Sequence, residues 1–149
     1  MQFGLYPVDD AVGAILGHAA RAGTTLFRKG RRLSADDIAA LQAAGVRDVV
    51  VARLETDDIV EDEAAARIAA ASAGSDVRIG AAFTGRANLY AEADGLALVD
   101  GERVNAVNLI DEAITIATLA PFTRVSPRQM LATIKIIPFA APRKSVEAA

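Results

Sequence analysis

The sequence has no cysteine, no tryptophan and a single histidine, His18, among its 149 residues. Without cysteine, the chain has no disulfide, no thiolate nucleophile and no cysteine-ligated metal site. One histidine gives little support to a histidine-based metal site or to a Ser-His-Asp triad within one chain. His18 has no acidic neighbour in the sequence, so a structural or surface role is favoured over proton transfer. We therefore expect no metal site and no histidine-based catalytic site.

The chain also lacks a long apolar segment and an excess of positive charge. No stretch approaches the roughly 20 apolar residues that span a bilayer, and the first residues have neither the basic nor the apolar region of a secretory signal. The formal net charge is −3, from 16 basic and 19 acidic residues, so no general field attracts nucleic acid. We expect a cytoplasmic protein without a membrane or nucleic-acid partner.

The composition is that of a folded globular protein, with 52% hydrophobic and 23% charged residues. We predict a mixed α/β (α+β) fold, in which a small β-α-β unit with two main helices packs beside a β-rich, partly barrel-like lobe. Residues 1–140 are expected to form a single compact domain. Its α/β portion is 34–82 and its β-rich portions are 1–33 and 83–140. Residues 141–149 are expected to be a tail or the start of a linker.

The clearest helical signals lie in the α/β portion. Ser34 suits an N-cap, and Asp37 three residues later completes a capping-box pattern. Gly45 suits the position after a helix end, so a helix over 35–44 is predicted. A strand over 46–54 follows, because three consecutive valines indicate burial on both faces.

A second helix is predicted over 60–73. Asp57 or Asp58 can cap it, and the acidic residues of its first turn suit the positive end of the helix dipole. A strand over 77–82 comes next. This order of elements predicts a right-handed parallel crossover between the strands at 46–54 and 77–82.

Two charged clusters have simple structural explanations. The acidic residues between 55 and 63 lack the glycine and the ligand spacing of a calcium loop, so a helix N-terminus explains them better than a metal site. The basic residues between 28 and 32 lie in a predicted hairpin with a turn at Gly30. An anion patch is the alternative there, but no aromatic side chain lies among the charges as single-strand nucleic-acid binders require.

Turns and apolar runs organise the β-rich portion after residue 82. Asp94-Gly95 is a strong hairpin signal, and Asp100-Gly101 supplies a second tight turn. Long apolar strands are predicted over 113–119 and 130–137.

Lys135 lies among the aliphatic residues of the second long strand. Alternation places it on the face of Thr133, opposite to Ile134 and Ile136. Because a buried, unpaired ammonium is unfavourable, Lys135 must reach water, a carboxylate or an anionic ligand. A solvated position is the simpler interpretation.

A polar loop between two strands is the best candidate binding site. Its backbone amides and guanidinium suit an oxyanion, nearby asparagines add amides, and Lys135 adds a point charge. Turn chemistry, with Arg86 paired to Glu92 or Asp94, explains the same residue types without a ligand. No catalytic residue is assigned. The candidate ligand-binding residues are Thr84, Gly85, Arg86, Asn88, Asn105, Asn108 and Lys135.

Several short strings resemble the N-terminal region of bacterial molybdopterin-binding proteins of molybdenum cofactor biosynthesis. The resemblance covers nearly the whole chain, and its last string is the most distinctive. The strings are residues 10–18 (DAVGAILGH), 29–33 (KGRRL), 51–54 (VARL), 61–65 (EDEAA), 83–89 (FTGRANL), 93–95 (ADG), 111–115 (DEAIT) and 132–139 (ATIKIIPF).

In such proteins this region precedes a molybdopterin-binding α/β domain, sometimes followed by a nucleotidyltransferase domain. The resemblance implies a role in making or handling the molybdenum cofactor, with a molybdopterin-type molecule or an adjoining molybdopterin-binding domain as partner. The sequence departs from that architecture by stopping at Ala149, where the next domain would begin, and it has no Walker-type or nucleotidyltransferase loop. The residues themselves identify no cofactor.

Three functions follow as hypotheses from the sequence. The first is an accessory binding or docking domain that is non-catalytic on its own. The second is a purely structural module for dimerisation or domain docking, with a homodimer as one form. The third is an independent enzyme in which Lys135 works with Asp94, Asp100 or Asp111 as acid and base, although nothing in the spacing fixes that geometry.

Overall fold

The computed structural model describes residues 1–149. The chain divides into two compact units, unit 1 (Met1–Thr56) and unit 2 (Asp57–Ala149). Each unit has its own cluster of buried apolar residues. The boundary falls inside the expected α/β portion at 34–82. The class of the fold is the expected one, mixed α/β.

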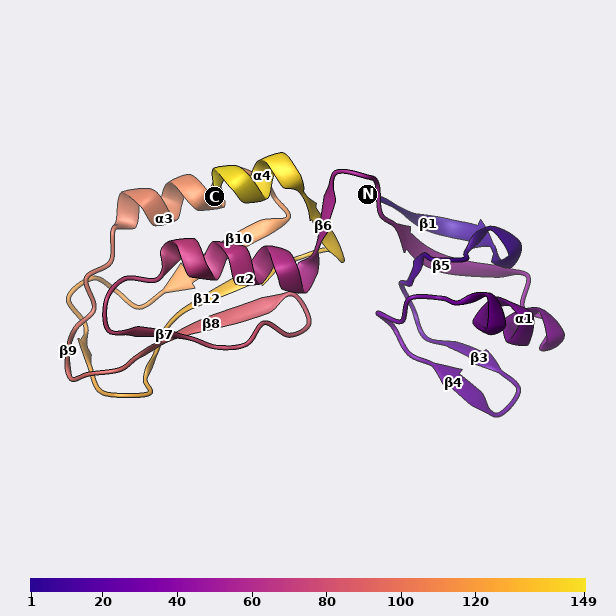
Figure 1. The fold of residues 1–149 in the computed structure, drawn as a ribbon, viewed down its shortest axis with the longest axis horizontal. Helices are drawn as coiled ribbons and strands as arrows, with labels where there is room; N and C mark the ends of the chain where they lie inside the picture. Colours follow the sequence, from indigo (N-terminus) through magenta and orange to yellow (C-terminus); the bar gives the residue numbers. More distant parts are fainter. The chain divides into compact units, whose positions relative to one another are not determined.

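Unit 1 joins a three-stranded antiparallel sheet, a two-stranded hairpin and one helix (Figure 1). The sheet order is β1-β5-β2, and β3 pairs with β4. The turn of that hairpin is at Gly23, with φ +60°, and not at Gly30 as expected. Its elements are β1 Gln2–Pro7, a 3-10 helix Val8–Asp10, β2 Ile15–Leu16, β3 Ala20–Ala22, β4 Thr25–Phe27, α1 Ala35–Ala43 and β5 Asp48–Arg53.

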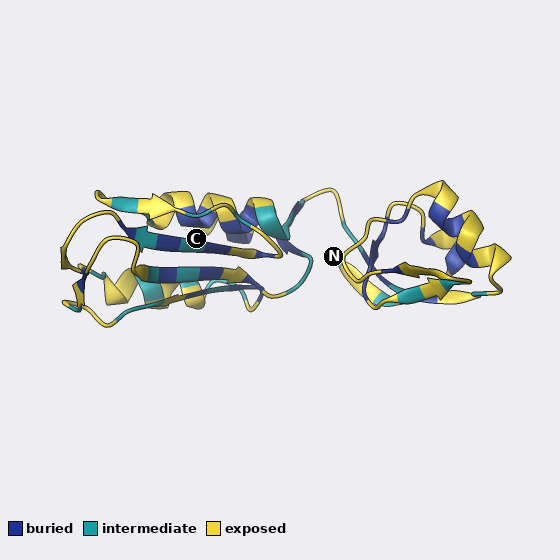
Figure 2. Ribbon diagram, turned by 90° about the horizontal axis from the view of Figure 1, so that it is seen from below, coloured by how far each residue is buried: buried dark blue, intermediate teal, exposed yellow.

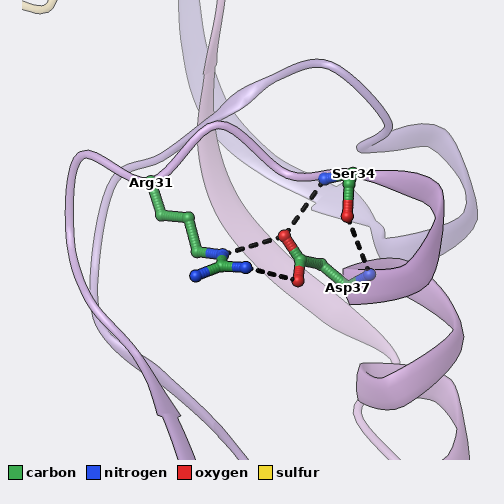
Figure 3. A network of polar contacts seen from close by, with 3 residues as sticks. All are labelled: Arg31, Ser34 and Asp37. Atoms are coloured by element: carbon green, nitrogen blue, oxygen red, sulfur yellow. Dashed lines mark hydrogen bonds and ion pairs between the residues drawn. The ribbon is translucent and has the colours of Figure 1, made fainter.

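The start of α1 contains the predicted capping box and an added ion pair (Figure 3). The Ser34 hydroxyl accepts from the Asp37 amide, and the Asp37 carboxylate accepts from the Ser34 amide. Arg31 donates to both carboxylate oxygens of Asp37 at 2.8 Å. These bonds lower the pKa of Asp37, chiefly through Arg31 and then through the Ser34 amide. Arg31, one residue of the basic segment between 28 and 32, therefore has a structural role at the start of α1.

Unit 2 contains a four-stranded antiparallel sheet of order β10-β12-β8-β7 and three helices (Figure 1). Two short strand pairs, β9 with β11 and β6 with β13, complete it. Its elements are β6 Asp58–Val60, α2 Glu61–Ser72, β7 Val77–Ile79, β8 Arg86–Ala91, β9 Gly95–Leu96, α3 Gly101–Asn108, β10 Ile114–Thr118, β11 Arg124–Val125, β12 Met130–Ile136, β13 Ala140–Pro142 and α4 Arg143–Ala148.

One face of the four-stranded sheet forms the core of unit 2. Ala132, Ile134 and Ile136 of β12 pack with Ala64 and Ile68 of α2, and all five are buried. Figure 2 shows buried stretches in dark blue along the strands of unit 2 and on one side of its helix α2. Helix α2 contacts both β8 and β12. The alternate residues of the same strands therefore lie on the opposite face.

Three expectations about connections are wrong. The strands near 46–54 and 77–82 do not form a parallel crossover, because β5 pairs antiparallel with β1 and β2, whereas β7 pairs antiparallel with β8 in another sheet. Asp94-Gly95 does not close a hairpin, because β9 pairs with β11. The sheets are open, so no part of the chain forms the expected barrel-like closure.

Helices α3 and α4 were not predicted from the sequence. Asp100 is the N-cap of α3, where its carboxylate accepts from the Arg103 amide at 3.1 Å. The expected tail contains α4, whose Val146 is buried in the core of unit 2. Neither Asp57 nor Asp58 caps α2, since its N-cap is Val60 and no side chain bonds there.

Helix α4 is attached to the start of β10 by a buried hydroxyl. Ser145 Oγ donates to Asp111 Oδ2 at 2.6 Å, and the Ala113 amide donates to Oδ1 at 2.9 Å. These two bonds lower the pKa of Asp111, with the serine hydroxyl as the larger cause. The residues after 141 are thus part of the packed unit.

No helix of the chain is both long enough and apolar enough to cross a membrane.

The Asp37 network predicts how the stability of unit 1 depends on pH. Folding lowers the pKa of Asp37, so the ionised carboxylate adds to the free energy of unfolding. This contribution is fully present above the unfolded-state pKa, near 3.9. It is lost as the pH falls through the lower pKa of the folded state. We expect Asp37→Asn to destabilise unit 1 at pH 7 and to reduce its loss of stability on acidification to pH 3. Denaturant unfolding followed by the Ile38 and Leu41 methyl signals measures both effects.

The control for this prediction is Asp36→Asn. Asp36 lies in the same first turn of α1 and is exposed, so it removes the same charge near the helix dipole without breaking the network. Ser34→Ala is expected to destabilise unit 1 by about 1 kcal/mol, the usual effect of losing an N-cap. Equal pH profiles for the Asp36 and Asp37 variants would show that the network has no special role.

Candidate functional site

The uncovered face of the four-stranded sheet in unit 2 is the candidate site. Ala87, Leu89 and Ala91 of β8 turn toward the helices and are buried. Arg86, Asn88 and Tyr90 therefore turn to the other face by alternation. We call this surface the open face, and its members are Arg78 of β7, Arg86, Asn88 and Tyr90 of β8, Thr133 and Lys135 of β12, and Thr115 and Ala117 of β10.

Arg86 and Lys135 lie directly opposite each other on the open face. They are register partners of β8 and β12, and the Ile136 amide donates to the Gly85 carbonyl at 2.7 Å. That bond makes Arg86 and Lys135 a non-hydrogen-bonded pair, the kind whose Cα atoms approach to about 4.5 Å. Both residues are exposed and neither forms an ion pair. Two like charges directly opposite each other are mutually destabilising.

The next pair along the open face, Asn88 and Thr133, has unused hydrogen-bonding capacity. The two are also register partners. Asn88 Nδ2 donates to the Tyr90 hydroxyl at 3.2 Å, but Asn88 Oδ1 and Thr133 Oγ1 are buried atoms without a hydrogen-bond partner. Buried polar atoms of this kind are rare in folded proteins. At the centre of the open face, one acceptor and one hydroxyl are therefore unpaired, and both atoms are buried.

Arg78 adds a third positive charge. Its guanidinium carbon lies 4.5 Å from the centre of the Tyr90 ring, in a cation–π contact. None of the eight open-face residues carries a carboxylate. The open face therefore combines positive charge with neutral hydrogen-bonding groups, although the formal charge of the whole chain is −3. This arrangement suits an anionic group that also carries a hydrogen-bond donor.

The Thr84-Gly85 turn has a structural role. Both residues have positive φ, +50° and +70°, and the bonds between Phe83 and Arg86 close a tight turn. The Gly85 amide donates to Asp62 Oδ1 at 2.7 Å. The sequence predicts that the amides of this turn bind an anion. In the structure the Gly85 amide already donates to the Asp62 carboxylate, so it is not available to a ligand. The turn instead connects the first turn of α2 with β8 and, through the Gly85 carbonyl, with β12.

The structure does not bring the two asparagines of α3 to the open face. Asn108 binds the backbone of Ile116, donating to its carbonyl at 2.9 Å and accepting from its amide at 2.8 Å. The side-chain amide of Asn108 thus satisfies the backbone hydrogen-bonding groups of Ile116 at the outer edge of β10. Asn105 is exposed on the same helix, which packs its Val104 and Val107 against the core. Of the seven expected site residues, Arg86, Asn88 and Lys135 share the open face.

Sequence reasoning missed Arg78, Tyr90 and Thr133 as members of this surface. Thr133 shares the parity of Lys135, and Tyr90 shares the parity of Arg86 and Asn88, so period-two alternation carried that signal. Arg78 had no comparable signal, because its place depends on the pairing of β7 with β8.

His18 and Arg32 do not form a second anion-binding surface. His18 is exposed and contacts the Phe3 ring edge-to-face, with centroids 6.5 Å apart. The guanidinium of Arg32 donates to the Gly13 carbonyl. No group of three or more histidine and carboxylate side chains is arranged to hold a metal ion.

Comparison with known proteins gives one match. A family model described as a domain of unknown function (DUF8806) matches residues 5–53. The matched stretch lies entirely within unit 1 and is about a third of the chain. No curated protein and no solved structure matches the chain.

The turn before β8 predicts a strong sensitivity to a side chain at Gly85. A Cβ there would lie 2.8 Å from the Ile136 carbonyl oxygen and 2.7 Å from Glu61 Oε2, at a φ of +70°. We expect Gly85→Ala to destabilise unit 2 by about 1–3 kcal/mol, the range for a residue held in an unfavourable backbone region. Urea unfolding of unit 2 tests this. Gly101→Ala is the control, since a Cβ on Gly101 meets nothing within 4 Å.

Proposed function

We propose that this chain is an accessory binding or docking domain, non-catalytic on its own, and that the open face of unit 2 receives an anionic group. The observation that carries the proposal is the Arg86–Lys135 pair, two exposed cations placed opposite each other with no carboxylate partner. We place this function in the cytoplasm, as the sequence led us to expect.

The energetics favour an anion at this pair. Without a counter-ion, the two cations repel each other across the strands. An anion between them removes that repulsion and accepts charge-assisted hydrogen bonds, each worth about 1.5–3 kcal/mol. Asn88 and Thr133, one step along the strands, supply an acceptor and a hydroxyl to the same ligand. A phosphate group attached to a body with N–H donors meets these requirements.

The resemblance noted in the sequence suggests which ligand this is. Molybdopterin combines a phosphate with a ring that carries N–H groups, so it has the chemistry that the open face would accept. An adjoining molybdopterin-binding domain could offer an acidic segment to the same surface. We propose a molybdopterin-type molecule, or the domain that binds it, as the partner.

An acid–base role for Lys135 has less support. The carboxylate of Asp100 caps α3 and pairs with Arg103 at 3.3 Å. Asp111 is held by Ser145 and Ala113 at the start of β10. These two carboxylates already have structural partners. Asp94, the third candidate, forms no ion pair, and none of the three is a member of the open face. A binding role therefore fits Lys135 better than a catalytic one.

Pyrophosphate titration tests the proposed surface. We expect pyrophosphate to bind wild-type protein with an affinity that falls as salt rises, because exposed charges are screened. Arg86→Ala and Lys135→Ala should each weaken binding about tenfold, the loss of roughly 1.4 kcal/mol from one charge-assisted contact. NMR chemical-shift titration of the full chain measures the affinity and locates the site.

Arg67→Ala is the matched control. It removes one positive charge from an exposed side of α2, where Arg67 pairs with Glu63. This variant should keep the wild-type affinity, since Arg67 is not on the open face. Unchanged binding in both the Arg86 and Lys135 variants, or shifts confined to other surfaces, would contradict an anion site on the open face.

A structural dimerisation role is favoured by one observation on unit 1. The side chains of Phe3 and Leu5 on β1 are 54% and 67% exposed, and β1 is an edge strand whose outer side pairs with no other strand. Exposed apolar edge strands promote pairing between chains. Sedimentation equilibrium of wild type and Leu5→Lys tests this role, with a dimer expected only for the wild type. A wild-type monomer at high concentration would contradict it.

A further inference from the structure

Unit 2 also contains a cavity of about 580 Å³ on the side of the sheet that the helices cover. Leu89 and Ala132 from the sheet line it, together with Val104 and Val107 of α3. These four residues are apolar and belong to or pack against the core of the unit. The volume lies within the range of about 300–1,000 Å³ that is usual for small-molecule sites.

Small side chains explain why the space exists. Ala91 and Ala132 line it from the strands and Ala71 from α2. Helix α2 ends at Ser72, and beyond this residue α3 contributes only the valines Val104 and Val107 to the apolar lining. A larger side chain at the buried Ala91 or Ala132 would occupy part of this space.

The mouth of the cavity exposes apolar surface. Leu96 and Leu98 line the cavity and are 57% and 80% exposed. Their segment is held to the rest of unit 2 by the two-residue pairing of β9 with β11 and by bonds of Ala97 to Thr123 and Phe122. A ligand in the cavity would remove these leucine side chains from water, which stabilises the complex.

The charges at the cavity are mainly negative. Asp76, Asp94 and Asp100 are among the lining residues, and Arg103 is the only basic one. Arg103 is already paired with Asp100, its Nε lying 3.3 Å from the carboxylate. Asp76 and Asp94 form no ion pair. Their charge is therefore available to a ligand.

We propose that this cavity binds a small organic cation, an apolar and preferably aromatic body that carries one ammonium or amidinium group. The apolar lining receives the body, and the carboxylates of Asp76 and Asp94 attract the charged group. This site is separate from the open face, which lies on the other side of the sheet and has the opposite charge. The two sites therefore select ligands of opposite sign.

A pair of probes with the same ring and opposite charge tests the proposal. The probes are 2-(1-naphthyl)ethylammonium and 1-naphthylacetate, titrated into the full chain and followed by NMR. From typical affinities per ligand atom, the cation is expected to bind with a Kd of about 0.1–1 mM. The anion should bind at least about fivefold more weakly, because the unpaired carboxylates repel it. The shifted signals should include Val104, Val107 and Ala132.

Three variants separate the contributions. Asp76→Asn and Asp94→Asn should each weaken binding of the cation about threefold, as expected for partly solvated charges, and should not weaken binding of the anion. Leu98→Ser should weaken both probes, because it removes apolar contact at the mouth. Glu102→Gln is the control, since Glu102 is an exposed acid on α3 that does not line the cavity.

Three kinds of result would overturn the proposal. Equal affinity for the two probes, or an affinity that neither aspartate variant changes, would overturn the assignment of a cation site. Binding of neither probe at millimolar concentration would overturn the cavity as a ligand site. Shifts on the open face instead of the cavity would do the same. The first two kinds of result are independent of pyrophosphate binding, which uses other residues.

Discussion

The antiparallel pairing of β8 with β12 is the constraint on which the rest of unit 2 depends. Alternation along these two strands sends Ala87, Leu89, Ile134 and Ile136 to the core, and sends their neighbours to the other side. A shift of one residue would exchange the two sets. The same pairing thus forms the hydrophobic core and sets two cations opposite each other on the open face.

Hydrogen bonds of polar side chains hold the surrounding elements against this sheet. Asn108 completes the outer edge of β10, Asp62 receives the Gly85 amide, and Ser145 joins α4 to Asp111. Each of these polar groups would carry a desolvation penalty if its partner were lost. Asn108 and the Thr84-Gly85 turn, which suggested a ligand site, therefore serve the fold, whereas Arg86 and Lys135 have no such partner.

The two sides of the sheet in unit 2 differ in chemistry as well as in covering. The open face has three cations and no carboxylate. The cavity beneath the helices has an apolar lining and more carboxylates than cations. Alternation along the strands produces this separation, since it directs Arg86 and Lys135 to one face and apolar side chains such as Leu89 and Ala132 to the other. Together they support a binding role for unit 2, while the family match concerns unit 1 alone.

The sequence by itself determined the local features. The Ser34–Asp37 capping box, the two helices in the α/β portion and the parity of Lys135 all depend on interactions within a few residues, so they could be predicted. The tertiary structure decided which strands pair, since pairing energy depends on side chains distant in the sequence. It therefore replaced the parallel crossover with antiparallel sheets. The tertiary structure also places Asp100 at the N-cap of α3. It separates the asparagines of α3 from Arg86 and Lys135, because backbone groups compete with ligands for polar side chains, and Asn108 binds the backbone of β10.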